Sequence, residues 1–98
     1  MRIKYDLSLR FADVDINEVI IDQYYSYKHY DVSDWIILEL IKNLHNRKSS
    51  NKTENERFEY YVEEPVFHND KPYRLILVME KGFNYIGVIN AFRVKEKK

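Results

Sequence analysis

The sequence predicts a small α+β domain with the element order strand, helix, helix and then a three-stranded antiparallel meander, with both helices on one face of the sheet. Two observations predict this class. Apolar residues between Ile16 and Leu44 recur at helical spacing, whereas from Phe58 onward they form strand-like runs. The 98 residues leave room for one hydrophobic core, so we expect a single domain over residues 1–98.

The composition restricts the kinds of protein that this chain can be. An apolar content of 45%, including 15% aromatic residues, is enough for a core. The 16 Lys and Arg residues balance 16 Asp and Glu residues, which weakens a nucleic-acid interpretation unless cations gather locally. The absence of cysteine excludes disulfide and thiolate chemistry. No apolar run approaches the roughly 20 residues that cross a bilayer, and the N-terminus is unlike a signal peptide, so we expect a cytoplasmic protein without membrane association.

The first part of the chain predicts one strand and one helix. Residues 2–11 alternate between apolar and polar side chains, which is typical of a half-buried strand. Asp15 and Glu18 then have the spacing of a capping box. The apolar residues that follow lie along one helical stripe, so a first helix is expected over 16–27.

A second helix is predicted after Ser33, which is a good N-cap residue. Five apolar residues lie on one face of this helix: Ile36, Ile37, Leu40, Ile41 and Leu44. The segment 46–56 contains no apolar side chain and predicts an exposed loop. A short basic tail at 95–98 ends the chain.

The rest of the chain predicts three strands joined by tight turns. The expected strands cover residues 58–66, 73–80 and 85–94. Asn69-Asp70 and Lys81-Gly82 are candidate two-residue turns, and Gly82 supplies a positive φ. Pro65 cannot donate to a ladder, so it favours an edge position or a bulge.

The turn at Lys81-Gly82 predicts which side chains share a face, because paired residues point to the same side. With this turn, Val78 pairs with Tyr85 and Arg74 pairs with Ile89. One face is then apolar and suits the helices, with Leu75, Leu77, Met79, Ile86, Val88 and Phe92. The opposite face gathers polar and aromatic side chains, namely Arg57, Tyr61, Glu63, Arg74, Tyr85 and Arg93.

Such a face suits cleavage of RNA without a metal or another cofactor, because the ribose 2′-hydroxyl is an internal nucleophile. Arg74 and Arg93 are expected to bind the scissile phosphate and stabilise its charge. Tyr85 is a candidate for proton transfer, and Glu63 a candidate base. Tyr61 and Arg57 are expected to contact bases and phosphates. The alternative is a set of ordinary cross-strand ion pairs on a solvated face.

A second group of candidates lies in the segment YYSYKHY at 24–30. Lys28 and His29 are flanked there by tyrosines, and basic residues interleaved with aromatic ones can bind single-stranded nucleic acid. The alternative is that the tyrosines are core and the basic pair complements a helix C-terminus. His45 and His68 are isolated and have no metal-ligand spacing. The chain has no glycine-rich phosphate-binding motif.

Four segments resemble toxins of the RelE/ParE superfamily, in particular the BrnT-type branch. They are KHYDVSDW at 28–35, ERF at 56–58, YRLILVMEKG at 73–82 and YIGVINAFRVK at 85–95. The resemblance implies a RelE-like sheet and a toxin that binds and cleaves RNA through Lys28, His29, Arg57 and Arg93. It also implies functional positions at Tyr73 and Arg74, and a cognate antitoxin as partner.

The neutral charge leaves a second function open, a non-catalytic binding module such as an immunity or inhibitor protein. The acidic residues Glu59, Glu63 and Glu64 lie close in sequence to the candidate arginines and favour this alternative. Such a module would recognise a partner protein by charge and shape rather than cleave RNA.

Overall fold

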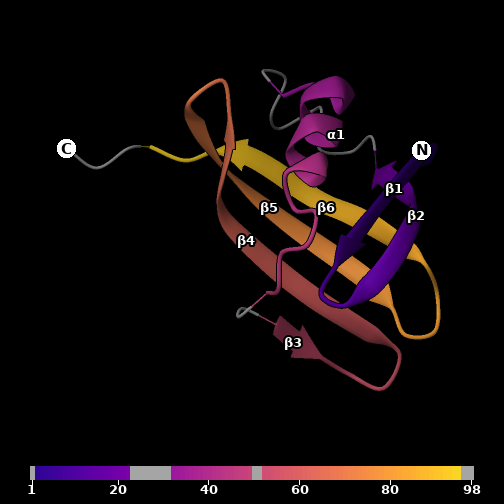
Figure 1. Cartoon of the computed structure of the whole chain (residues 1–98). Helices are drawn as coiled ribbons and strands as arrows, with labels where there is room; N and C mark the ends of the chain where they lie inside the picture. The colour runs from indigo at the N-terminus through magenta and orange to yellow at the C-terminus, as the bar shows by residue number, and fades with distance from the viewer. Residues whose placement is uncertain (1, 23–31, 50–51, 96–98) are drawn as a thin grey trace.

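The computed structural model describes residues 2–22, 32–49 and 52–95, which form one six-stranded mixed sheet with a helix over one face (Figure 1). The elements in chain order are β1 (Arg2–Phe11), β2 (Val14–Asp22), α1 (Asp34–Lys42), β3 (Lys52–Glu54), β4 (Phe58–His68), β5 (Lys71–Glu80) and β6 (Tyr85–Arg93). The strand order in the sheet is β1-β2-β6-β5-β4-β3. All neighbouring strands are antiparallel except β2 and β6, which are parallel.

The predicted fold class is wrong, because the described part of the chain is mostly β and α1 is its one helix. The helix expected over 16–27 is a strand as far as Asp22, and its remaining residues lie outside the described ranges. The buried positions of β2 are Ile16, Val19 and Ile21. These buried residues are three and then two positions apart, and the spacing of three resembles a helical stripe. The pairing of β1 with this part of β2 shifts register between Asp6 and Leu9. The run of β-branched residues in VDINEVIID favours the strand.

A tight turn explains why the capping-box spacing does not start a helix. Ala12 and Asp13 both have positive φ, 52° and 64°, and join β1 to β2 as a two-residue hairpin. Asp15 is consequently paired with Arg10 across the hairpin, with 2.9 Å between Oδ1 and Nη1. The carboxylate that we expected as an N-cap is instead part of a cross-strand ion pair.

The second predicted helix is confirmed as α1. The Ser33 hydroxyl accepts a hydrogen bond from the backbone N–H of Ile36 at 3.3 Å, which satisfies one free donor of the first turn. Four of the predicted apolar residues are fully buried, namely Ile37, Leu40, Ile41 and Leu44. They pack with the buried side chains of β5 and β6 in one core. No helix in the described ranges is both long enough and apolar enough to span a bilayer.

The predicted strands of the second half are present, with changes at their connections. The turn at Asn69-Asp70 is confirmed, with φ values of 51° and 63°. The β5–β6 connection is longer than two residues and covers Lys81 to Asn84, with Gly82 at φ 85°. The loop expected over 46–56 contains the short edge strand β3, which pairs with β4.

A register irregularity in β4 changes which side chains share a face. Glu63 pairs with Leu75 and Val66 pairs with Tyr73, so Glu64 and Pro65 together oppose one residue of β5. The bulge expected at Pro65 is therefore present. The extra residue turns the preceding part of β4 over, and Tyr61 and Glu63 lie on the helix-covered face rather than beside Arg74.

A second irregularity separates the two expected catalytic arginines. Ile76 pairs with Asn90 and Leu77 with Val88, which leaves Ile89 as the extra residue in β6. Beyond it, Arg74 pairs with Phe92, and Arg93 pairs with Tyr73. Because consecutive residues of a strand point to opposite faces, the expected grouping of Arg93 with Arg74 is wrong, and so is the assignment of Phe92 to the core face.

Candidate functional site

The face of the sheet opposite α1 carries a groove with a cavity of about 580 Å³. Its lining residues come from β1, β2, β4, β5, β6 and the segment before β4: Arg2, Ile20, Asp22, Arg57, Phe58, Tyr60, Val78, Glu80, Tyr85, Gly87, Val88 and Ile89. Strand pairing brings them together, because Tyr60 pairs with Val78 and Val78 pairs with Gly87. Ile20 pairs with Gly87 on the other side. We call this region the open-face groove.

A polar cluster of three side chains lies in the open-face groove. The Arg57 guanidinium donates from Nε to Oε2 of Glu80 at 2.6 Å. The Tyr85 hydroxyl donates to the other carboxylate oxygen, Oε1, at 3.0 Å. The Glu80 side chain is only 13% exposed, whereas that of Arg57 is 71% exposed. A shielded carboxylate thus binds a phenol and a solvent-accessible guanidinium at once.

The neighbours of this cluster set the protonation states of its members. The hydrogen bond from Arg57 lowers the pKa of Glu80, and the hydrogen bond from Tyr85 adds to that effect. Burial raises the pKa of Tyr85, and its hydrogen bond to Glu80 raises it further. At neutral pH the cluster therefore holds an ionised carboxylate, which can accept a proton, and a protonated phenol, which can donate one. The arginine stays cationic because Glu80 raises its pKa.

Aromatic side chains form one wall of the groove and a glycine forms part of its floor. Phe58 and Tyr60 are neighbours on β4, with ring centroids 6.3 Å apart, and the Arg57 guanidinium carbon lies 4.9 Å from the Phe58 ring centre. A Cβ at Gly87 would lie 2.8 Å from Cγ1 of Val78. The missing side chain at Gly87 lets Val78 pack over the backbone of β6 and keeps this part of the floor low.

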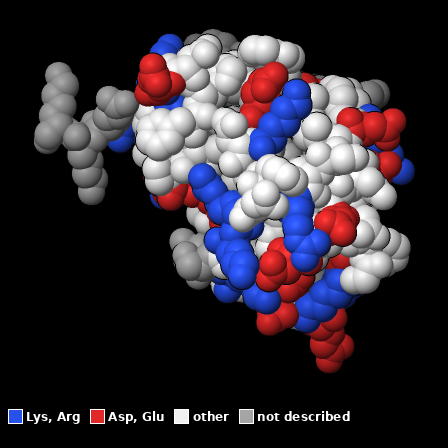
Figure 2. Space-filling model, in the orientation of Figure 1, with Lys and Arg blue, Asp and Glu red and all other residues white. Residues whose placement is uncertain are grey.

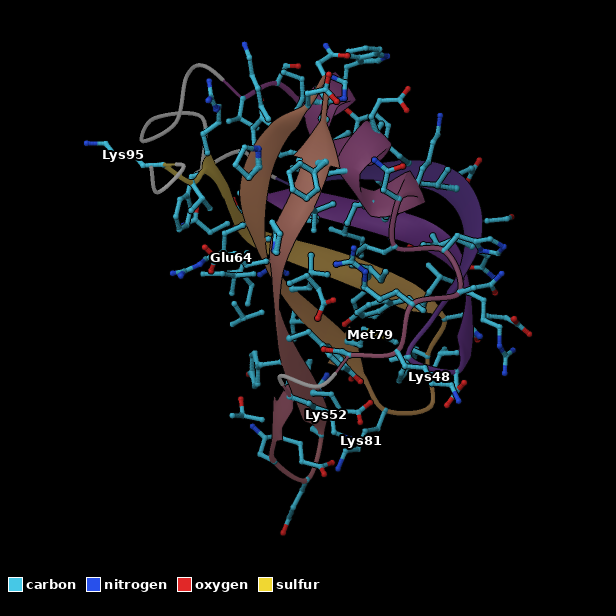
Figure 3. All side chains as sticks on the ribbon, turned by 60° about the vertical axis from the view of Figure 1, so that its left-hand side comes forward. Lys48, Lys52, Glu64, Met79, Lys81 and Lys95 are labelled. Carbon is cyan, nitrogen blue, oxygen red and sulfur yellow. The ribbon has the colours of Figure 1, made fainter. Side chains whose placement is uncertain are left out.

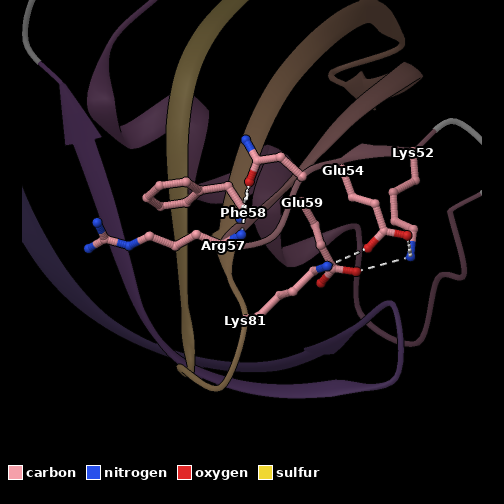
Figure 4. Close-up of polar contacts among 7 residues, drawn as sticks. Lys52, Glu54, Arg57, Phe58, Glu59 and Lys81 are labelled. Atoms are coloured by element: carbon pink, nitrogen blue, oxygen red, sulfur yellow. Dashed lines mark hydrogen bonds and ion pairs between the residues drawn. The ribbon is translucent and has the colours of Figure 1, made fainter.

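An ion-pair network lies beside the groove and ties β3 to the β5–β6 turn. Lys52 contacts Glu59 at 3.0 Å, and Lys81 contacts Glu54 at 2.7 Å. Figure 3 shows Lys52 and Lys81 at the same end of the sheet, with Lys95 far from them. In Figure 4 the side chain of Arg57 extends away from this network. The network therefore holds the edge of the sheet without occupying the groove.

The structure brings together only part of the site that the sequence predicted. Arg57 and Tyr85 meet at Glu80, as described above. Tyr61 and Tyr73 are 3% and 4% exposed and belong to the core. Lys28 and His29 lie outside the described residues.

Glu63, the expected base, is buried on the helix-covered face. One of its oxygens lies 3.4 Å from the Arg47 guanidinium, and the other accepts a hydrogen bond from Ser49. Arg74 is on the open face but does not line the groove; it binds Glu64 at 2.6 Å and lies over Phe92. These contacts fix both residues as parts of the scaffold.

Glu80 was missed by the sequence analysis, although the strand pattern contained the signal. Glu80 is two residues from Val78 and therefore points to the same face of β5. The register observed at the end of the hairpin, with Phe58 opposite Glu80, brings the start of β4 beside it. The sequence correctly predicted that the last strand begins at Tyr85, but the longer β5–β6 connection pairs Val78 with Gly87 instead of Tyr85 and could not be read from the sequence.

The histidines and acidic side chains of the described residues add no metal site to the groove. No group of three or more His, Asp or Glu side chains there could hold a metal ion. His45 accepts a hydrogen bond at Nδ1 from the backbone of Arg10 at 3.0 Å, and His68 packs edge-on against Trp35 at 5.4 Å. On the face seen in Figure 2, basic and acidic side chains are interspersed.

Comparison with protein-family models, curated proteins and solved structures gave no match to this chain. The resemblance to RelE/ParE toxins therefore stays a prediction from short motifs. The groove and the three side chains at its polar end are the features of this chain that point to a function.

Proposed function

We propose that the chain is an endoribonuclease that cleaves RNA in the open-face groove, with Glu80, Tyr85 and Arg57 as its catalytic residues. The observation that carries the proposal is the Glu80 carboxylate, which binds Arg57 at 2.6 Å and Tyr85 at 3.0 Å on the wall of an aromatic-lined cavity. A base, an acid and a cation are the three groups that cleavage through the 2′-hydroxyl needs.

The proposed reaction is a transesterification at one phosphodiester. Glu80 accepts the proton of the 2′-hydroxyl, and O2′ attacks phosphorus. The P–O5′ bond breaks, and O5′ leaves with the proton of Tyr85, which yields a 2′,3′-cyclic phosphate and a free 5′-hydroxyl. Arg57 stabilises the charge that grows on the non-bridging phosphate oxygens. The proton then returns from Glu80 to Tyr85 along their hydrogen bond, and the cluster is restored without a metal ion.

The exposure of the groove cations supports RNA as the substrate. The side chains of Arg2 and Arg57 are 77% and 71% exposed, so both can contact phosphates without moving out of the protein. Phe58 and Tyr60 offer aromatic surfaces to bases in the same groove. If the chain is a toxin, as its motifs predict, an antitoxin that covers this groove is the expected partner.

A cleavage assay on a fluorophore-labelled RNA, with chelator present, tests the proposal. Glu80→Gln is expected to lower kcat/KM by about 10²–10⁴-fold because it removes the base, and Tyr85→Phe by a similar factor because it removes the acid. The matched control is Glu54→Gln, which alters an ion-paired carboxylate outside the groove and should leave the rate unchanged. Equal rates for wild type and Glu80→Gln would contradict the proposal.

The pH dependence of the same assay has a defined shape. Because the pKa of Glu80 is lowered, the base stays ionised until the pH falls below the ordinary value of about 4.3. Because the pKa of Tyr85 is raised, the acid keeps its proton beyond about pH 10. We expect a broad plateau of kcat/KM between these limits, with the acidic decline lost in Glu80→Gln.

A non-catalytic binding module is the second candidate, and the charge balance of the groove favours it. Arg2 and Arg57 are matched by Asp22 and Glu80, so the groove has no excess of cations. In this case purified protein would leave RNA intact at all pH values. Expression in a bacterial host separates the candidates further, since growth arrest that Glu80→Gln relieves is expected only of the ribonuclease.

A further inference from the structure

We propose that Phe58 and Tyr60 are two adjacent base-stacking subsites that restrict the open-face groove to unpaired RNA. This inference rests on the proposed function for the identity of the ligand. It adds the form of RNA that the groove accepts and the residues that select it. The two side chains lie on β4, and both line the cavity.

The spacing of the two rings is the first argument. Residues two apart on a strand are separated by about 6.6 Å, and the ring centroids are 6.3 Å apart. Successive bases within a duplex strand are only about 3.4 Å apart. Two neighbouring bases that stack on these rings must therefore separate from each other, which unpaired RNA can do and a duplex cannot.

The availability of the rings is the second argument. Phe58 and Tyr60 are partly exposed on a face that no described helix or strand covers. Their rings are tilted by 45° to each other, so they do not stack mutually face to face. By contrast, the next aromatic residue of β4, Tyr61, is buried against Phe11 at 5.2 Å. The adjacent residues Tyr60 and Tyr61 thus point to opposite faces, Tyr60 into the groove and Tyr61 into the core.

The position of the arginine is the third argument. The Arg57 side chain runs beside Phe58 (Figure 4), and its guanidinium carbon lies 4.9 Å from the Phe58 ring centre. Its Nε donates to Glu80. A base on Phe58 or Tyr60 therefore brings its own phosphate toward the proposed catalytic cluster. Positive charge beside stacking rings is the combination that single-strand-binding grooves use.

Fluorescence anisotropy with 2′-O-methyl RNA tests this inference, because blocked 2′-hydroxyls prevent cleavage. The probes are a labelled single strand of mixed sequence and the same strand annealed to its complement. We expect the single strand to bind at least about 10-fold more tightly than the duplex. Tyr60→Ala should weaken single-strand binding by about 5- to 150-fold, and Tyr60→Phe should retain it.

Two further variants test the second ring and provide a control. Phe58→Leu keeps an apolar side chain but removes the ring, and it should weaken binding as Tyr60→Ala does. Trp35→Ala is the matched control, since Trp35 is an aromatic residue 61% exposed on α1 and outside the groove, and it should bind like wild type. Thermal unfolding of each variant shows that it is folded at the assay temperature.

The outcomes separate this inference from the proposed function. Equal binding of single strand and duplex, or wild-type binding by both ring variants, overturns the stacking subsites even if RNA is cleaved. Selective single-strand binding by a protein that never cleaves RNA supports the subsites and rejects catalysis. Absence of binding to either probe overturns the subsites, whereas the proposed function is overturned only by the cleavage assay.

Discussion

The two faces of the sheet use the same strands but stabilise their charged groups differently. On the helix-covered face, the Glu63 side chain is 6% exposed and is held by Arg47 and Ser49, as part of the scaffold. On the open face, Glu80 is 13% exposed, and its partner Arg57 reaches into solvent. On the helix-covered face the buried carboxylate of Glu63 makes a structural contact. The less deeply buried carboxylate of Glu80, with a solvent-accessible cation beside it, marks the candidate site.

The largest loss in the free energy of unfolding is expected for a residue of the helix-covered face. Its size tests whether that face alone contains the core. Leu77 is fully buried beneath α1, so Leu77→Ala should reduce the free energy of unfolding by about 2–5 kcal/mol through lost transfer energy and a cavity. Its neighbour Val78 points into the open-face groove, and Val78→Ala should cost about 1 kcal/mol or less. Urea denaturation measures both. Similar losses for the two variants would contradict the assignment of the faces.

The second prediction concerns the buried carboxylate. Arg47→Ala leaves Glu63 with Ser49 as a partner and should reduce the free energy of unfolding by about 1–3 kcal/mol, because a buried carboxylate loses a charged hydrogen-bond donor. Replacing that charge as well, in Arg47→Ala/Glu63→Gln, should recover a large part of the loss. A double variant that is as unstable as the single one would show that Arg47 acts through packing instead.

The third prediction concerns Gly87 in the groove floor. Gly87→Ala places a Cβ 2.8 Å from Cγ1 of Val78, and the β-branched side chain has little freedom to move away. We expect a loss of about 1–2 kcal/mol by overpacking. The double variant Val78→Ala/Gly87→Ala removes the clash and should be more stable than Gly87→Ala alone. No recovery in the double variant would point to backbone strain at Gly87.

The elements that were predictable from sequence are those whose local signals agree with their packing. Ser33 and the apolar stripe that follows it give α1, and alternation gives β1. The first helix was mispredicted because Ile16 and Val19, three positions apart as on one face of a helix, are both buried in a strand whose pairing with β1 is irregular. Local periodicity cannot distinguish that spacing from a helix.

The candidate site was only partly predictable, because two single-residue irregularities decide the faces. The extra residue at Glu64–Pro65 turns Glu63 into the core, and the one at Ile89 turns Arg93 away from Arg74. A register shift of one residue reverses every side chain beyond it. Pro65 signalled the first irregularity, whereas the second has no proline or glycine at the extra residue. Tyr85 was found because it precedes the extra residue at Ile89 and so keeps its predicted face. Arg57 was found because it lies before β4 begins, outside the strand whose alternation turns Tyr61 and Glu63 into the core.

The smallest expected effect concerns the ion pairs that tie β3 to the sheet. Lys81 and Glu54 are 40% and 46% exposed, so solvent screens their contact. Lys81→Ala should lower Tm by about 1–5 °C at low salt and by less at 1 M salt. Lys81 lowers the pKa of Glu54, so the wild-type advantage is present above about pH 4.3 and is lost as the pH falls through the lowered value. A Tm difference that persists at low pH and high salt would mean that Lys81 stabilises the turn by packing. In that case the network drawn in Figure 4 would have no electrostatic role in holding the edge of the groove.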